Sequence, residues 1–182
     1  MKDFQLRILG QCWIDDDPNN DSDLCSHGQI YLRVNFQEIL TELDGDWTVS
    51  TSMLLLLRTL FEDYDFNDEP SLILCCGMLM MASCPVSVGW RVKHKEKRVL
   101  IDKIRKCPTT NISDTIEFPK ASIELELGEY AAPILKCAVD VADFFQKSKE
   151  RKPIDAYDKK EYEKFWEEFT ELKTKANGIV RI

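Results

Sequence analysis

The sequence predicts an α+β domain with a mainly antiparallel sheet, helices packed on one face of that sheet, and two C-terminal helices. Apolar residues alternate with polar ones in several short segments, a period typical of strands that bury one face. Between residues 130 and 172 the apolar residues instead recur every three or four positions, as on the buried side of a helix. Strand-like segments cluster and the last two helices follow them, which favours antiparallel pairing.

Two strands are predicted near the N-terminal end. Their apolar residues occupy alternate positions: Phe4, Leu6, Ile8, Cys12 and Ile14 in the first, and Ile30, Leu32, Val34 and Phe36 in the second. The link at residues 15–23 consists of turn-forming residues and carboxylates, which are poor strand formers. We therefore expect an exposed hairpin loop there.

The middle of the chain is predicted to hold a helix and a buried strand. After the turn at Asp44-Gly45-Asp46, Thr48 and Ser50 are candidate N-caps of a helix that ends near residues 66–70. The apolar stripe of this helix consists of Met53, Leu54, Leu57, Leu60, Phe61 and Tyr64. The run at residues 72–81 is apolar at both odd and even positions, as in a central strand covered on two faces, and its periodicity also fits a buried helix.

A second hairpin is predicted at residues 86–104, because apolar alternation resumes at Val86 and a polar turn, Lys95-Glu96-Lys97, divides the segment. One more strand covers residues 123–127, and Gly128 ends it. The first C-terminal helix has a core-facing stripe of Tyr130, Ile134, Cys137, Ala138, Val141 and Phe145. The second is expected to begin at Asp158, with Glu161 completing a capping box, and to bury Tyr162, Phe165, Trp166, Phe169 and Leu172.

The composition indicates one globular domain over residues 1–182. The chain is 44% hydrophobic and 31% charged, with few Gly and Pro. The chain start lacks a basic region followed by an apolar run, and the longest apolar run is far shorter than the roughly 20 residues that span a bilayer. Seven cysteines, an odd number and mostly in apolar runs, predict free thiols. We therefore expect a cytoplasmic protein without membrane insertion.

Charge is unevenly distributed along this acidic chain, whose formal net charge is -8. Residues 1–70 hold 4 Lys and Arg against 15 Asp and Glu, residues 71–113 hold 8 against 2, and residues 114–182 hold 12 against 15. The overall charge argues against non-specific binding to nucleic acid or to an anionic membrane. Residues 71–113 nevertheless form a basic island.

Three segments carry a resemblance to a known family: residues 45–60 (GDWTVSTSMLLLLRTL), 84–90 (CPVSVGW) and 165–169 (FWEEF). They resemble parts of an uncharacterised bacterial protein family with no assigned activity. The resemblance would cover most of the chain, but the segments are mostly structural in character. It implies no functional residues.

Recognisable catalytic motifs are absent from the sequence. The nucleophile elbow, the phosphate-binding Gly-rich loop and the zinc-protease motif do not occur, and His27 and His94 are the only histidines. This disfavours a nucleophile with a histidine base. Zinc binding by cysteines and histidines is also disfavoured, because their spacing fits no closed-finger pattern: Cys25, His27, Cys75, Cys76, Cys84 and His94.

The acidic loop offers a calcium alternative. Oxygen-bearing side chains occupy every second position at Asp15, Asp17, Asn19, Asp21 and Asp23. Pro18 is out of place in a calcium loop, no Gly occupies the sixth position, and no Glu occupies the twelfth. A solvated acidic loop is therefore preferred over a calcium site.

The basic hairpin is the candidate partner-binding surface. Its cations mostly lie opposite in parity to the apolar residues and so on the solvent side: Arg91, Lys93, Lys95, Lys97 and Arg98. One interpretation is an edge hairpin whose lysines deter aggregation. The others are contact with an acidic protein partner, or with nucleic acid, which is disfavoured because the hairpin lacks interleaved aromatic residues.

These observations predict a non-enzymatic cytoplasmic binding or regulatory module that acts through a surface, for example an immunity-like protein that neutralises a toxin. No cofactor is expected. The alternative is a small-molecule-binding or hydrolytic enzyme that uses carboxylates, because paired carboxylates leave no sequence signature. A deep pocket with convergent, partly buried carboxylates and Trp or Tyr walls would favour the enzyme, and a flat surface would favour the binding module.

Overall fold

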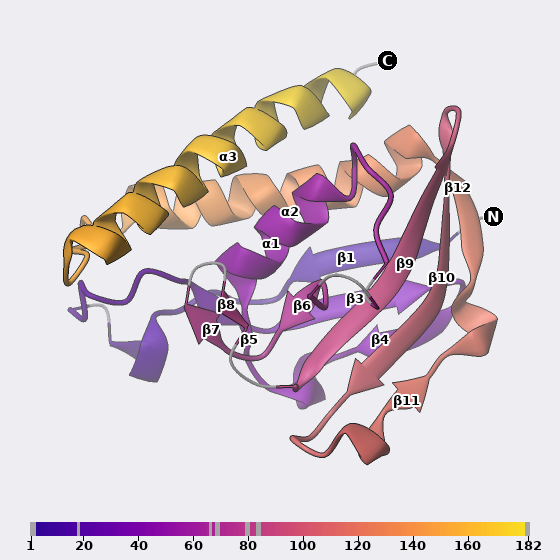
Figure 1. The fold of residues 1–182 in the computed structure, drawn as a ribbon, viewed down its shortest axis with the longest axis horizontal. Helices are drawn as coiled ribbons and strands as arrows, with labels where there is room; N and C mark the ends of the chain where they lie inside the picture. Colours follow the sequence, from indigo (N-terminus) through magenta and orange to yellow (C-terminus); the bar gives the residue numbers. More distant parts are fainter. Residues whose placement is uncertain are drawn as a thin grey trace.

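A computed structural model describes residues 3–17, 19–65, 67, 70–78, 81–82 and 85–180. Figure 1 shows the helices gathered on one side of the strands, and a long hairpin that extends at one end of the molecule. Every strand pairing within the described residues is antiparallel. The predicted α+β class is confirmed, with the strands distributed over two larger and two smaller sheets.

The N-terminal sheet has the order β1-β3-β4, with β1 at Phe4–Ile8, β3 at Ile30–Val34 and β4 at Gln37–Leu40. Both predicted N-terminal strands are present. The first is shorter than expected, and Cys12 continues only as an isolated bridge to His27. β4 was not predicted, because Phe36 continues the apolar alternation of β3 and so hid the turn between the two strands. Phe36 lies in that turn, with a φ of 64° and a side chain that is 60% exposed.

Asp3 holds this turn to the first strand. Its buried carboxylate accepts hydrogen bonds from Arg33 Nη2 at 2.9 Å and from the Phe36 backbone N–H at 3.0 Å. The hydrogen bond from the Arg33 guanidinium is the largest effect on the pKa of Asp3 and lowers it below its ordinary value.

Acid should therefore weaken the folded state through Asp3. A carboxyl whose folded pKa is lowered contributes stability above its unfolded pKa of about 3.9, and that stability is lost as the pH falls through the folded pKa. We expect Asp3→Asn to lower the free energy of unfolding at neutral pH and to reduce its dependence on pH below about 4. Urea unfolding of both proteins at several pH values measures this, and identical pH profiles would contradict it.

Helix α1 (Val49–Arg58) is the centre of the core. Every residue of its first nine, from Val49 to Leu57, is buried, so the predicted apolar stripe is only part of a helix that is covered on all sides. The helix ends at Arg58, well before residues 66–70, because the chain then turns and Tyr64 forms a β-bridge with Val92. Thr48 occupies the N-cap position, but its side chain accepts no hydrogen bond from the helix backbone, and its hydroxyl donates to the Cys75 carbonyl.

The prediction of a single central strand at residues 72–81 is wrong. The segment instead contains β6 (Ile73–Leu74) and β7 (Gly77–Met78), and β8 (Met81–Ala82) pairs with β7 in a separate small hairpin. β6 is the last strand in its sheet order. The segment is apolar at both odd and even positions because Leu72, Ile73 and Leu74 are buried, and β6 packs against α1. Such burial does not require a long strand.

The second large sheet contains the predicted hairpin. It has the order β11-β10-β9-β6, and β12 also pairs with β10. The hairpin strands are β9 (Ser87–Lys95) and β10 (Arg98–Cys107). β11 covers Ile116–Glu117, and the predicted strand at 123–127 is β12 (Ile123–Glu126). A further two-stranded sheet joins β2 (His27–Gly28) and β5 (Trp47–Thr48).

Two long helices close the chain, as predicted. α2 (Leu127–Lys147) follows β12 directly and packs on β1 and β12, while α3 (Ala156–Val180) packs on α1 and α2. The predicted start of the last helix at Asp158 is wrong, because Asp155 Oδ1 accepts the Asp158 N–H and the helix begins two residues earlier. On its apolar stripe Phe165 and Phe169 are buried, whereas Trp166 is half-buried.

Within the described residues Cys12, Cys107 and Cys137 are free thiols, as the sequence predicts, and Cys84 lies outside those residues. None of the helices in the described ranges combines the length and apolar character needed to cross a membrane.

Candidate protein-binding surface

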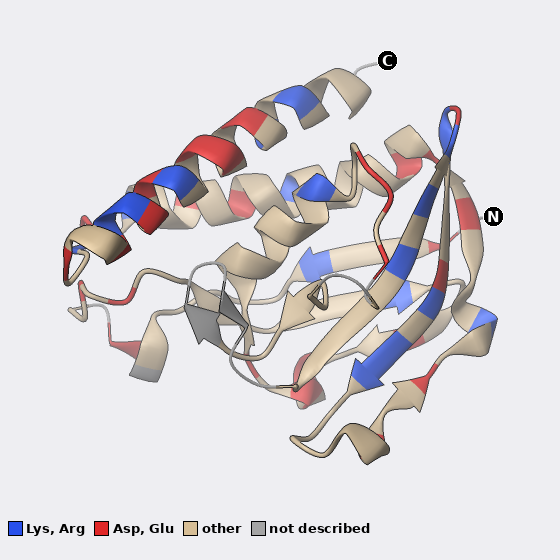
Figure 2. Ribbon diagram, viewed as in Figure 1, with Lys and Arg blue, Asp and Glu red and all other residues tan. Residues whose placement is uncertain are grey.

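The β9–β10 hairpin presents one face to the core and one to solvent. Val88, Trp90 and Val92 are buried on the inner face. Arg91, Lys93 and Lys95 alternate with them and therefore lie on the outer face, as the sequence predicts. Figure 2 shows blue Lys and Arg segments along both strands of the hairpin and at its tip, which projects beyond the rest of the sheet.

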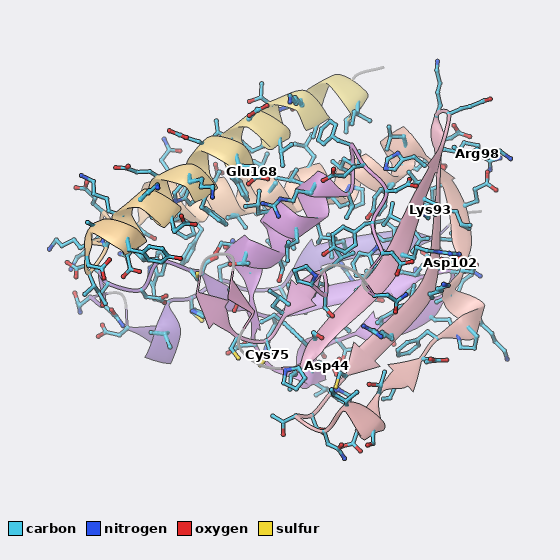
Figure 3. The ribbon with its side chains drawn as sticks, viewed as in Figure 1. Asp44, Cys75, Lys93, Arg98, Asp102 and Glu168 are labelled. Carbon is cyan, nitrogen blue, oxygen red and sulfur yellow. The ribbon has the colours of Figure 1, made fainter. Side chains whose placement is uncertain are left out.

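Three of the five predicted partner-binding residues take part in ion pairs within the protein. Arg91 Nε donates to Asp102 Oδ1 across the hairpin at 2.7 Å, and this hydrogen bond is the main cause of a raised pKa of Arg91. Lys93 Nζ lies 3.0 Å from Asp63 Oδ2, in the loop after α1. The remaining pairs join Arg98 on β10 to Glu124 at 2.9 Å and to Glu126 at 3.4 Å, both on the neighbouring strand β12. Figure 3 shows Lys93, Arg98 and Asp102 along the hairpin.

Lys95 and Lys97 at the tip differ from these three. Both side chains are exposed, and neither has an ion-pair partner in the part of the chain that the structure describes. Glu96 between them adopts a φ of 56° and reverses the chain. The tip therefore carries two exposed cations without an ion-pair partner among the described residues, on either side of the exposed Glu96.

Three cations of the basic island pair with carboxylates that are distant in sequence: Lys93, Arg98 and Lys106. Asp63 and Asp44 come from the N-terminal part of the chain, and Asp44 pairs with Lys106 at the far end of β10. Charge counting along the sequence cannot reveal this, because the pairing depends on how the loop after α1 and β12 lie against the hairpin. Because these ion pairs engage part of the predicted residues, the candidate binding surface is reduced to the tip and the exposed outer face next to it.

The edge of β9 that faces away from β10 is covered near Val92 by main-chain pairing with Tyr64. Tyr64 N–H donates to the Val92 carbonyl, and Val92 N–H donates to the Tyr64 carbonyl, both at 2.9 Å. Asp63 Oδ1 accepts the next outward N–H, that of His94, at 2.7 Å. Since hydrogen bonds already cover this edge at Val92 and His94, protection of the edge against aggregation does not account for the lysines at the tip.

A cleft on the hairpin sheet was not anticipated from the sequence. The pairing of β9 and β10 shifts register between Asp102 and Arg105, and Lys103 within this bulge has a φ of 52°. Beside the bulge lies a cavity of about 550 Å³. Its lining residues are Asn67, Asp102, Lys103, Ile104, Arg105, Glu117, Phe118, Pro119 and Ser122. The spacing of three between Ile101 and Ile104, where a regular strand has two, is the sequence signal that could have revealed the bulge.

The carboxylates of the calcium alternative have separate partners. Asp17 Oδ1 accepts the Asn19 N–H at 2.8 Å, and Asp21 Oδ2 pairs with Lys152 Nζ at 2.5 Å, which lowers the pKa of Asp21. Asp23 Oδ2 accepts the Ile14 N–H at 2.8 Å. The side chain of Asp15 lies outside the described residues. The arrangement does not bring these three carboxylates to one point, and so the calcium interpretation gains no support.

The acidic loop is also docked rather than freely solvated. Lys149 Nζ donates to Asn19 Oδ1 at 2.7 Å, and Arg151 Nη1 donates to the Asn20 carbonyl at 2.8 Å. Arg151 stacks on Trp13, 3.8 Å from the ring centroid. The basic linker between α2 and α3 thus fixes the loop to the body.

One cysteine and one histidine meet in the fold. Cys12 and His27 are opposite each other in a β-bridge, and His27 Nε2 lies 3.4 Å from Asp23 Oδ2. Burial, followed by the charges of nearby aspartates, raises the pKa of the Cys12 thiol, which therefore stays protonated at neutral pH. This disfavours a thiolate nucleophile. Within the described residues no group of three or more His, Cys, Asp or Glu side chains could hold a metal ion.

The fold and this surface define an α+β protein with a buried central helix and a long antiparallel hairpin that carries lysines at its tip. Comparison with protein-family models, with curated proteins and with solved structures gives no match. The resemblance to an uncharacterised bacterial family is an expectation that these comparisons do not support.

Proposed function

We propose that this protein is a binding module that associates with an acidic protein partner through the tip and outer face of the β9–β10 hairpin, in the manner of an immunity protein, without performing chemistry on the partner. The proposal rests on two exposed lysines, Lys95 and Lys97. Neither has an ion-pair partner among the described residues, and the protein as a whole has a net charge of -8. They mark one place where an acidic partner is attracted while much of the remaining surface repels it.

The hairpin presents these lysines on a rigid support. Strands of nine and ten residues form the hairpin, and the ion pairs of Arg91 and Arg98 link its strands to each other and to β12. A rigid support reduces the entropy lost when a complex forms. Opposite charges on two proteins mainly increase the association rate and favour one orientation of docking.

The cavity beside the β10 bulge gives the enzymatic alternative less support than the hairpin gives the binding module. Asp102 in that cavity is neutralised by Arg91, and Glu117 is exposed. The apolar part of its wall comes from Ile104, Phe118 and Pro119, with no Trp or Tyr among its lining residues. This cavity therefore does not have the arrangement expected of the enzyme, in which partly buried carboxylates converge between aromatic walls.

We expect Lys95→Glu with Lys97→Glu to slow association with the partner about tenfold or more at low salt and to reduce the salt dependence of the association rate. Affinity capture from native lysate, followed by mass spectrometry, identifies the partner, and stopped-flow mixing of the purified proteins measures the rate. Stability should change little, because exposed charges contribute at most about 1 kcal/mol each.

Lys160→Glu with Lys164→Glu on α3 is the matched control, because both lysines are exposed and the change in net charge is the same. If this control slowed association as much as the tip variant, the effect would come from the net charge alone. That result, or an unchanged rate in the tip variant, would contradict the proposed use of the hairpin.

A further inference from the structure

The cleft at the β10 bulge adjoins the outer face of the hairpin that carries Lys93 and Lys95. Its lining residue Asp102 is the partner of Arg91, which precedes Lys93 and Lys95 along the outer face of β9. Lys95 is four positions after Arg91 along the strand, a distance of about 14 Å at the usual rise per residue. A standard protein interface buries about 800 Å² on each partner, so one interface can cover both the tip and the cleft.

The charge of the cleft is set by Lys103. Asp102 is neutralised by Arg91, and Arg105 is directly opposite Glu117 in the β10–β11 register. Lys103 is exposed and has no ion-pair partner among the residues that the structure describes. The cleft therefore offers one uncompensated cation beside an apolar wall formed by Phe118 and Pro119.

The backbone at Lys103 is unfavourable for its residue type. A φ of 52° lies in the left-handed region, which residues with a Cβ atom adopt at a cost in free energy and glycine adopts readily. Bulges change the direction of a side chain, and strained residues cluster where direction matters for binding. Lys103 is exposed at this bulge and lines the cleft beside it.

We propose that the bulge cleft binds a carboxylate side chain from an acidic segment of the protein partner, with Lys103 as the cation and Phe118 and Pro119 as the apolar wall. This inference rests on the proposed function and deepens it, because it adds a second contact to the one at the tip. The tip attracts the partner over a distance, and the cleft holds one acidic segment in a defined place.

The test is an NMR titration of the isotope-labelled full chain with a blocked hexaglutamate peptide. We expect saturable shifts of the amide signals of residues 102–105 and 117–119 at millimolar peptide. Lys103→Gly should weaken this binding at least fivefold while leaving the melting temperature unchanged or higher, because glycine tolerates the same φ. Lys160→Gln on α3 removes another exposed lysine and should bind the peptide as the parent protein does.

Each other outcome would overturn the inference. Unchanged affinity in Lys103→Gly, or shifts centred only on the tip, would show that the cleft does not hold the carboxylate. Equal binding of acetate at the same carboxylate concentration would identify a site for small free anions and not for a partner segment. The titration uses no natural partner, so its failure is distinguishable from a failure of the tip variants in the association experiment.

Discussion

Gly28→Ala should destabilise the protein by about 3 kcal/mol or more, because backbone strain and overpacking at one site add together. Gly28 has a φ of 147°, a conformation that residues with a side chain rarely adopt. A Cβ atom at this position would lie 2.1 Å from the Gly10 carbonyl oxygen and 2.9 Å from its carbon. Both are main-chain atoms, so a side-chain rotation cannot relieve the clash. Urea unfolding measures the loss.

Two other glycines separate the causes of this effect. Gly45 has a φ of 80°, and no heavy atom lies within 4 Å of the position that a Cβ atom would take there. Gly45→Ala therefore reports the strain alone, about 1–2 kcal/mol. Gly10 has neither a positive φ nor a close neighbour, and Gly10→Ala should change stability by less than about 0.5 kcal/mol. A Gly28→Ala protein as stable as Gly10→Ala would show that the two chain segments do not approach as described.

Elements that bury a single face were predictable from the sequence. The alternation at residues 86–92 identified β9 and placed Arg91 and Lys93 on its outer face, and the helical stripe from Tyr130 to Phe145 identified α2. In such elements the boundary between apolar and polar residues follows the boundary between core and solvent. Their ends were less predictable, since α3 begins at Ala156 and not at Asp158.

Elements in fully buried or strained surroundings could not be predicted in the same way. α1 is buried on every side, and its hydroxyl residues Ser50, Thr51 and Ser52 are buried like its apolar ones. The spacing of apolar residues therefore does not identify which face of this helix is buried. The run after Leu72 has no polar positions to set a period, and the short strands β6 and β7 were missed. Periodicity fails wherever both faces of an element have similar surroundings.

The same physical reasons decide which features of the candidate site were predictable from the sequence. The exposure of Lys95 follows from strand parity and that of Lys97 from its place in a polar turn, and the sequence contains both signals. The neutralisation of Lys93 by Asp63 depends on how distant segments pack, and no local pattern reports it. The direction of Lys103 depends on a left-handed φ at a residue type that gives no warning of it.

The last prediction concerns the attachment of α3. Phe169 is fully buried where α3 packs on α1 and α2, and its ring contacts those of Phe165 and Trp166 at centroid distances of 5.8 and 5.2 Å. Phe169→Ala should lower the free energy of unfolding by about 3–5 kcal/mol, since it removes a buried aromatic side chain and leaves a cavity. Trp166→Ala should cost less because that side chain is half-buried, and Tyr157→Ala, at an exposed position, should change stability by less than about 0.5 kcal/mol. Urea unfolding followed by circular dichroism ranks the three variants. An unchanged midpoint for Phe169→Ala would mean that α3 does not contribute to the core in solution.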